Sequence, residues 1–142
     1  MSATVVALHL SHASRAPLAA VASARALLDR GLEGDRHAKP GSRRSVLVVE
    51  QEVLDHFGLA PGDIREQVTV RGLDLNALAA GSRLAIGTAV LEVAGPCAPC
   101  ERMDELRPGL RQQLEGRRGR FVRVLEAGTV AVGDAIQVYP PA

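Results

Sequence analysis

The two cysteines of the chain, Cys97 and Cys100, lie three residues apart in the segment GPCAPCER (residues 95–102). They could form a dithiol redox pair, supply half of a tetrahedral zinc site, or include a single nucleophile or metal ligand. A redox pair of this kind favours a helix start, whereas this segment follows a predicted strand. A zinc site needs two more ligands, and the chain has no second C-x-x-C. Inert buried thiols are a further interpretation, and spacing alone does not separate redox, zinc and inert roles.

The residues around the thiols favour a positioned side chain. Pro96 and Pro99 stiffen the backbone, and Gly95 permits a turn or a close approach. A rigid loop at the end of a strand is a common place for a nucleophile or a metal ligand. Arg102 follows closely and could lower the pKa of a nearby thiol. A plain proline-rich turn is the alternative.

A second segment, GLEGDRHA (residues 31–38), places an acid, a guanidinium and an imidazole in consecutive positions. Asp35 could orient the His37 ring or an arginine, and Arg36 could bind a phosphate. His37 could donate a hydrogen bond to an anionic ligand or transfer a proton. The alternative is a surface loop with a weak ion pair.

A third segment, DIREQVTVRGLDL (residues 63–75), places Arg65, Gln67 and Thr69 at alternate positions of a predicted strand. One face of that strand would then carry a guanidinium, an amide and a hydroxyl group. Such a row is either a polar wall of a ligand site or a solvent-facing surface.

Composition limits the classes of function. The 142 residues include 46% hydrophobic and 23% charged residues, which predicts one soluble domain over residues 1–142. A net charge of +1 and only three aromatic residues argue against binding to nucleic acid or to a membrane. Lys39 is the only lysine, so a Schiff base with pyridoxal phosphate is not expected in this chain alone. Two closely spaced cysteines and no charged signal start predict a cytosolic protein.

The elements that must position these residues are mostly short strands. Apolar and β-branched runs predict strands at residues 4–10, 45–50, 64–70, 89–95, 120–128 and 135–140. Helices are predicted at residues 51–58, where Gly58 suits a left-handed end, and after Pro108. The alanine-rich residues 16–30 also predict a helix, although Pro17 counts against it. Many short strands with glycine and proline turns predict a mainly β, barrel-like domain with a few short helices.

Taken in order, these segments resemble the MOSC family, named after the C-terminal domain of molybdenum-cofactor sulfurases. The resemblance runs through GLEGDRHA, RSVLVVEQEVL, PGDIREQVTVRGLDL, GSRLAIGTAVLEVAGPCAPCERM and GRFVRVLEAGTVAVGD, over about residues 30–138. It implies a stand-alone member with a β-barrel-like fold. It also implies that the ligand is the molybdenum cofactor, a pterin dithiolene that carries molybdenum and a phosphate.

The resemblance also implies roles for single residues. Cys97, which follows Pro96, matches the family cysteine and would be the molybdenum ligand or a persulfide carrier, with Cys100 as an accessory thiol. Arg65 and Gln67 match a family R-x-N segment that holds the cofactor, with Gln in place of Asn. The remaining cofactor-binding candidates match the family loop and the basic position before the next strand: Asp35, Arg36, His37 and Arg44, with Arg43 as the alternative to Arg44.

Two activities follow as hypotheses from the resemblance. One is reduction of N-hydroxylated small molecules or bases, with Cys97 and His37 as catalytic residues and electrons from a separate protein. The other is sulfur transfer through a persulfide on Cys97, supplied by a separate cysteine desulfurase. A C-x-x-C redox or zinc-binding module stays open as a third.

Overall fold

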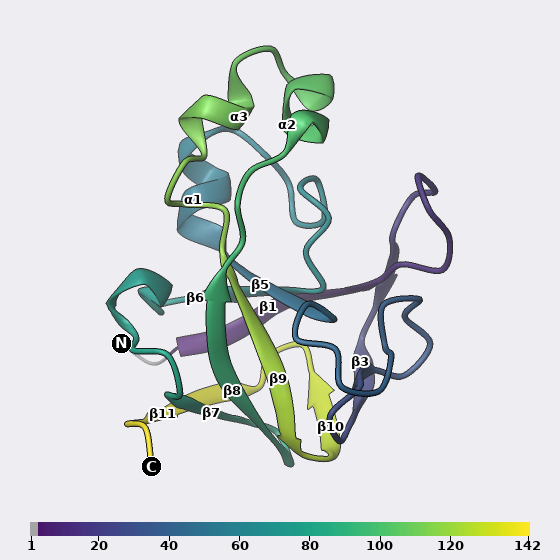
Figure 1. Cartoon of the computed structure of the whole chain (residues 1–142), viewed down its shortest axis with the longest axis vertical. Helices are drawn as coiled ribbons and strands as arrows, with labels where there is room; N and C mark the ends of the chain where they lie inside the picture. Colours follow the sequence, from purple (N-terminus) through teal and green to yellow (C-terminus); the bar gives the residue numbers. More distant parts are fainter. Residues whose placement is uncertain (1–2) are drawn as a thin grey trace.

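The computed structural model of the chain describes residues 3–142 and is built mainly from β-strands (Figure 1). The helical elements are short: α1 (Gln51–His56), the 3-10 turn η1 (Leu75–Ala77), α2 (Glu101–Leu106) and α3 (Leu110–Gln113). The strands are β1 (Ala3–Leu10), β2 (Ala19–Val21), β3 (Ser23–Leu27), β4 (Gly31–Leu32), β5 (Val46–Glu50), β6 (Val68–Arg71), β7 (Arg83–Ile86), β8 (Ala89–Pro96), β9 (Arg120–Glu126), β10 (Gly128–Ala131) and β11 (Ala135–Tyr139).

Seven of these strands close into a barrel. Their order is β11-β7-β8-β9-β5-β6-β1, and β1 pairs back with β11 through Ala3 and Ile136. Within residues 3–142 the β5–β6 pair is parallel and the other ladders are antiparallel, so the barrel is mixed. A parallel pair needs a crossover, and α1 lies in that connection. The mainly β, barrel-like fold with a few short helices that the sequence predicts is confirmed.

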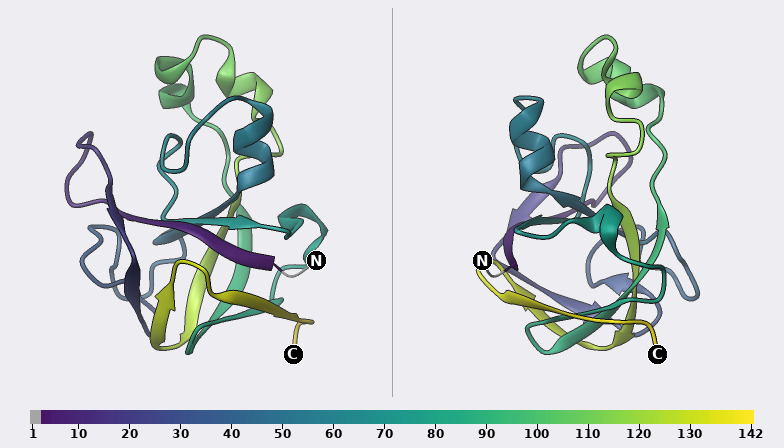
Figure 2. Two further views of the ribbon diagram at one scale, coloured as in Figure 1. Left: turned by 180° about the vertical axis from the view of Figure 1, so that it is seen from behind. Right: turned by 90° about the vertical axis from the view of Figure 1, so that its left-hand side faces the viewer.

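The helices α1, α2 and α3 gather at one end of the barrel, away from both termini (Figures 1 and 2). They cover a second apolar cluster outside the barrel core, which includes Leu47, Val49, Leu54, Ile64, Met103, Leu110 and Leu114. Cys97 and Phe121 pack against this cluster as partly buried residues. Cys97 therefore lies where the barrel meets the helical cover.

The helix predicted over residues 16–30 is wrong. This segment forms β2 and β3, and the second strand alternates exposed and buried residues with Ala24 and Ala26 inside. β3 pairs with β10 and β4 in a small three-stranded sheet. Alanine's helical preference is weak, and strand pairing with packing of its small side chains overrides it here.

The strand predicted over residues 64–70 is wrong in its first half, because the observed strand β6 covers Val68–Arg71. β6 begins at Val68, and Arg65 has a left-handed backbone with φ of 70°. Residues 64–67 therefore belong to the loop between α1 and β6, and the alternation inferred for Arg65 and Gln67 does not come from a strand. The helix expected after Pro108 is α3, whereas α2, directly after Cys100, was not expected.

Among residues 3–142, no helix has both the length and the apolar character needed to cross a membrane.

Candidate functional site

Cys97 follows the last residue of β8 and is held in place by the neighbouring strand. Its N–H donates to the carbonyl of Gly119 at 3.0 Å, which extends the β8–β9 pairing beyond Pro96. A Cβ on Gly119 would lie 2.3 Å from the Val48 carbonyl oxygen, so only glycine allows β9 to approach β5 this closely. Arg120 secures the same end of β8, since its Nε and Nη2 donate to the carbonyl of Ala94. The thiol thus sits on a rigid strand end.

The Cys97 thiol is half-buried beside a buried cation. Burial raises the pKa of the Cys97 thiol, and the guanidinium groups of Arg118 and Arg44 act in the opposite direction. Arg102, which the sequence suggested would lower a thiol pKa, is not among the groups that shift it. Arg118 is only 6% exposed and donates through Nη2 to the carbonyl of Ile64. Its Nε and Nη1 have no hydrogen-bond partner.

A pocket of about 180 Å³ opens beside Cys97, and we call it the Cys97 pocket. Leu47 and Phe121 form its apolar wall. Its polar wall contains His37, Gln67 and five arginines: Arg36, Arg44, Arg65, Arg102 and Arg118. Segments from four distant parts of the chain meet here, and the result is one thiol surrounded by cations.

Arg65 is the most constrained of these arginines. It has the left-handed backbone already noted, and Nη1 donates to the carbonyl of Ala16 at 2.6 Å. Its Nη2 is buried and has no partner. Burial lowers the pKa of Arg65, and the neighbouring cations Arg102 and Arg36 lower it further. Crowding of like charges and donors without partners both favour an anion in the pocket.

The Asp35 carboxylate orients His37. One of its oxygens accepts hydrogen bonds from His37 N–H and from His37 Nδ1, each at 2.8 Å. The other oxygen accepts from Ser11 N–H at 2.9 Å. Asp35 is 6% exposed, while His37 reaches the Cys97 pocket. Because Nδ1 faces the carboxylate, Nε2 is the ring atom free to bind a ligand or move a proton.

The side-chain amide of Gln67 forms its hydrogen bonds within the protein. Its Oε1 accepts from Leu47 N–H at 2.8 Å, and Nε2 lies 3.4 Å from both Asp35 Oδ2 and His37 Nδ1. The side chain is buried and braces the loop of Asp35 against β5. Gln67 therefore borders the pocket mainly as a support.

Most of the residues selected from the sequence meet in this pocket, but Thr69, Asp35, Pro96 and Cys100 do not line it. Thr69 is fully buried and donates to Glu66 Oε2. Asp35 stands behind His37. Pro96 borders two neighbouring hollows, and one of these shares Arg44 and Phe121 with the Cys97 pocket. Cys100 is exposed and precedes the first turn of α2.

Arg118 and Glu66 were not among the site residues predicted from the sequence, and Arg102 was predicted only as a neighbour of the thiols. Glu66 is fully buried, and its Oε2 accepts from Gly62 N–H and Thr69 Oγ1, both at 3.0 Å. Burial raises the pKa of Glu66, while Arg118 acts against the shift. The sequence around Arg118 and Glu66 does not show that either side chain is buried, and Arg118 is one of sixteen arginines. The signal that the sequence offers for Arg118 is the arginine pair in GRRGRF, just before a predicted strand.

The metal alternatives can be compared with this geometry. Residues 3–142 contain no cluster of three or more His, Cys, Asp or Glu side chains suited to a metal ion. A tetrahedral zinc site at the C-x-x-C segment therefore lacks further ligands in this part of the chain.

Comparison with known proteins identifies the family. The family model of the MOSC domain matches residues 21–137, and the chain belongs to the MOSC domain family. This family is associated with the molybdenum cofactor. No curated protein matches the chain.

Several solved structures share the fold. The YuaD protein from Bacillus subtilis has a TM-score of 0.81 at 22% identity, over 100% of this chain and 98% of that one. YiiM from Geobacillus stearothermophilus has a TM-score of 0.77 at 18% identity, over 96% of this chain and 75% of that one. YiiM from Escherichia coli has a TM-score of 0.73 at 19% identity, over 98% and 71%. At these sequence identities the similarity shows a shared fold and nothing further.

Proposed function

We propose that this MOSC protein binds the molybdenum cofactor, with Cys97 as the protein ligand to molybdenum, and reduces N-hydroxylated small molecules or bases. Electrons come from a separate partner protein. The observation that supports this most is the Cys97 pocket itself, in which one thiol faces five arginines. The cytosolic location stays a prediction from the sequence.

The residues present fit the chemistry of this cofactor. A thiolate is a soft ligand and suits molybdenum, and guanidinium groups suit a phosphate. Arg65 and Arg118 contribute three buried nitrogen atoms without partners, which an anionic ligand would satisfy. Arg36 and Arg44 are exposed at the mouth of the same pocket. These four arginines and Cys97 are therefore the residues that would hold the group.

The proposed reaction determines which groups the protein must provide. Reduction of an N-hydroxyl group takes up two electrons and two protons: the N–O bond breaks, a new N–H bond forms, and the oxygen leaves as water. When bound, the cofactor would supply two-electron redox chemistry at this site. His37 holds a proton at Nε2 for the leaving oxygen, and Asp35 keeps the ring oriented through Nδ1. Phe121 and Leu47 form the apolar wall of the pocket beside the thiol.

A second candidate function is sulfur transfer through a persulfide on Cys97. It is favoured by a separate hollow of about 170 Å³, formed by Pro96, Cys97, Ala98, Pro99, Glu115, Gly116 and Gly119. Cys97 therefore borders open space on a side other than the arginine-lined one. Incubation with a cysteine desulfurase and cysteine should then add one sulfur atom to Cys97, visible by mass spectrometry, and a protein without this adduct would exclude the role.

The first test is elemental analysis and pterin fluorescence on protein produced in a host that makes the cofactor. We expect about one molybdenum and one pterin per chain in the wild type, since one thiol ligand is available in the pocket. Cys97→Ala should lose the molybdenum, whereas the matched variant Cys100→Ala should keep it. In a reconstituted assay, Cys97→Ser should lose N-hydroxyl reduction.

Equal molybdenum content in the wild type and Cys97→Ala would exclude Cys97 as the metal ligand. Zinc bound tightly in place of molybdenum would favour the C-x-x-C zinc alternative.

A further inference from the structure

A groove of about 350 Å³ adjoins the Cys97 pocket over the last residues of β8, and we call it the β8 groove. The loop before β5 supplies Arg43 and Arg44, β8 supplies residues 92–96, and β9 supplies Phe121. Gly81, from the turn before β7, also lines the groove, and its N–H donates to a β8 carbonyl at 2.8 Å. Arg44 and Phe121 line the Cys97 pocket as well, so the two spaces are neighbours.

The floor of the β8 groove is an irregular strand end. The register of β8 against β9 shifts between Val93 and Pro96, which leaves Ala94 and Gly95 opposite Phe121 alone. Bulges of this kind are frequent next to binding and catalytic sites. A Cβ on Gly95 would meet no atom within 4 Å, so the space above the bulge is open.

The two arginines of the β8 groove carry charge that no nearby acid balances. The ion pairs found among residues 3–142 include neither Arg43 nor Arg44. The Arg44 guanidinium lies 5.8 Å from the centre of the Phe121 ring, and this contact holds it at the boundary between the groove and the Cys97 pocket. Arg43 lines the groove but not the Cys97 pocket, so it is the cation specific to the groove.

Glu92 is an acid in the lining, and its charge is balanced within the sheet. It lies opposite Arg83 on β7 and Arg123 on β9. Opposite charges at facing positions of neighbouring strands attract one another. Arg123 also pairs with Asp29 at 3.5 Å, so two arginines face two acids here. The groove therefore keeps the positive charge of its own two arginines, which favours a ligand with an acidic group.

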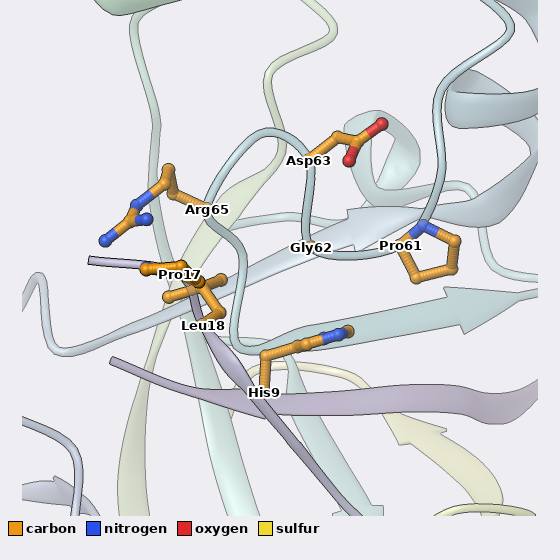
Figure 3. Close-up of a pocket in the computed structure, with 7 residues that line it drawn as sticks. All are labelled: His9, Pro17, Leu18, Pro61, Gly62, Asp63 and Arg65. Atoms are coloured by element: carbon orange, nitrogen blue, oxygen red, sulfur yellow. The ribbon is translucent and has the colours of Figure 1, made fainter. Parts of the chain in front are cut away.

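The hollow of about 290 Å³ beside β1 does not gather charge in this way. Figure 3 shows that Arg65 and Asp63 point away from one another there, with His9 on β1. Arg65 Nη1 is also held by the Ala16 carbonyl. An acidic group in this hollow would not meet two cations, as it would in the β8 groove.

We propose that the β8 groove binds the acidic end of the organic substrate, a small molecule that carries a carboxylate or a phosphate on an apolar body. The inference rests on the proposed function, because it places the N-hydroxyl end of the same molecule in the neighbouring Cys97 pocket. Arg43 binds the acidic group, and Phe121 and Pro96 contact the apolar body. Pro96 directly precedes Cys97, so a ligand that extends beyond the proline comes close to the thiol.

The binding test uses cofactor-free protein and does not depend on the proposed reaction. Benzoate and phenyl phosphate carry the two acidic groups on the same ring, and benzamide is the neutral counterpart. In NMR titrations, at least one anion should cause saturable shifts at Gly81 and Gly95 and bind at least about tenfold more tightly than benzamide. The tighter anion identifies the acidic group. Equal binding of benzamide, no saturable shift with either anion, or shifts confined to Leu47 and Gln67 of the Cys97 pocket would overturn the proposal.

A pair of matched variants locates the anion. Arg43→Gln should weaken binding of the tighter anion at least about fivefold, because it removes the cation specific to the groove. Arg25→Gln makes the same change at an exposed position of β3 outside the groove and should bind the anion like the wild type. Wild-type affinity in Arg43→Gln would overturn the proposal.

A second experiment connects binding with turnover in cofactor-loaded protein. A phenylhydroxylamine with the tighter-binding acidic group at its 4-position should have a kcat/KM at least about tenfold above that of phenylhydroxylamine itself. Arg43→Gln should reduce this ratio at least about fivefold, and an unchanged ratio would overturn the substrate role. Both compounds are measured on one preparation, so cofactor content cancels from the ratio. Reduction of neither compound would overturn the proposed function instead, and the NMR titrations would still decide whether the groove binds an acidic ligand.

Discussion

Glu50, the last residue of β5, carries a carboxyl group in an environment that disfavours its charge. Burial raises the pKa of Glu50 to about 7, and the nearby carboxylates of Asp74 and Glu52 contribute to the shift. A backbone hydrogen bond with Leu75 acts in the opposite direction. The folded protein therefore holds this proton at pH values where the unfolded chain has already released it.

This difference predicts a pH-dependent effect of Glu50→Gln. The folded pKa lies above the ordinary value of 4.5, so the free energy of unfolding falls as the pH rises from 4.5 to about 7. Above that range the full cost of the buried charge is present. Because Glu50 is partly exposed and screened, Glu50→Gln should stabilise the protein by about 1–2 kcal/mol at pH 8 and have no effect at pH 4. Urea unfolding at the two pH values measures this.

Glu33→Gln provides the control, since Glu33 is an exposed acid on the same chain. It should change stability little at either pH. If Glu50→Gln gave the same stability change at pH 4 and pH 8, the burial of the Glu50 charge would not be the cause.

The sequence indicates which side chains are reactive or charged, but it does not indicate which of several residues of the same type is buried. Cys97, Arg36, His37 and Arg65 were found because thiols are rare here and the other three stand in distinctive segments. Arg118 could not be found in this way, because its burial depends on contacts with distant parts of the chain.

At the scale of single elements, the approach of β9 to β5 depends on Gly119. Its φ is 99°, and an added Cβ would meet the Val48 carbonyl at 2.3 Å and the Val49 side chain at 2.8 Å. Gly119→Ala must therefore push β9 away from β5 and shift the carbonyl that accepts from Cys97 N–H. We expect a loss of about 3 kcal/mol or more in the free energy of unfolding, from overpacking and backbone strain together.

Gly116→Ala separates these two causes. Gly116 also has a positive φ, 76°, but an added Cβ there would have no neighbour within 4 Å. This variant should lose only about 1 kcal/mol, from the backbone conformation. Chemical denaturation of both proteins gives the comparison, and equal losses would show that the contact with β5 is unimportant.

Element predictions succeeded where local pattern and tertiary pairing agree. The β-branched run at residues 45–50 became β5, and Gly58 follows the end of α1 with a φ of 67°, as expected. The helix predicted over residues 16–30 is wrong because alanine content does not indicate whether a partner strand is present. β3 exists because β10 and β4 flank it. β4 follows it directly but is only 2 residues long, and β10 lies far away along the chain, so neither partner is evident from the local sequence.

At the scale of the whole molecule, β11 closes the barrel. It pairs with β7 on one side and with β1 on the other, and Ile136 is a core residue. A chain that ends at Asp134 should therefore lose cooperative thermal unfolding, because two strand edges and part of the core become exposed. A chain that ends at Tyr139 should unfold like the wild type, since it lacks only exposed residues. Circular dichroism melts distinguish the two, and a cooperative melt of the shorter chain would show that closure is dispensable.

A closed, strand-rich fold could be predicted from the number and spacing of short strands, but the strand order could not. The β1–β11 pairing joins the two ends of the chain, and the parallel β5–β6 pair depends on a crossover. These pairings depend on three-dimensional packing rather than on local preference. The pocket shared by the Asp35, Arg65, Cys97 and Arg118 segments follows from this order.

The wide separation of those four segments along the chain has a consequence for the order of events after synthesis. Contacts between distant segments form late, because the loops between them must close first. The Cys97 pocket therefore does not exist in a partly folded chain, and a ligand can enter only after the barrel has closed. Once bound, a ligand that recognises only the closed form opposes opening in proportion to its affinity and concentration. Supply of that ligand then affects how long the protein persists, as well as what it can do.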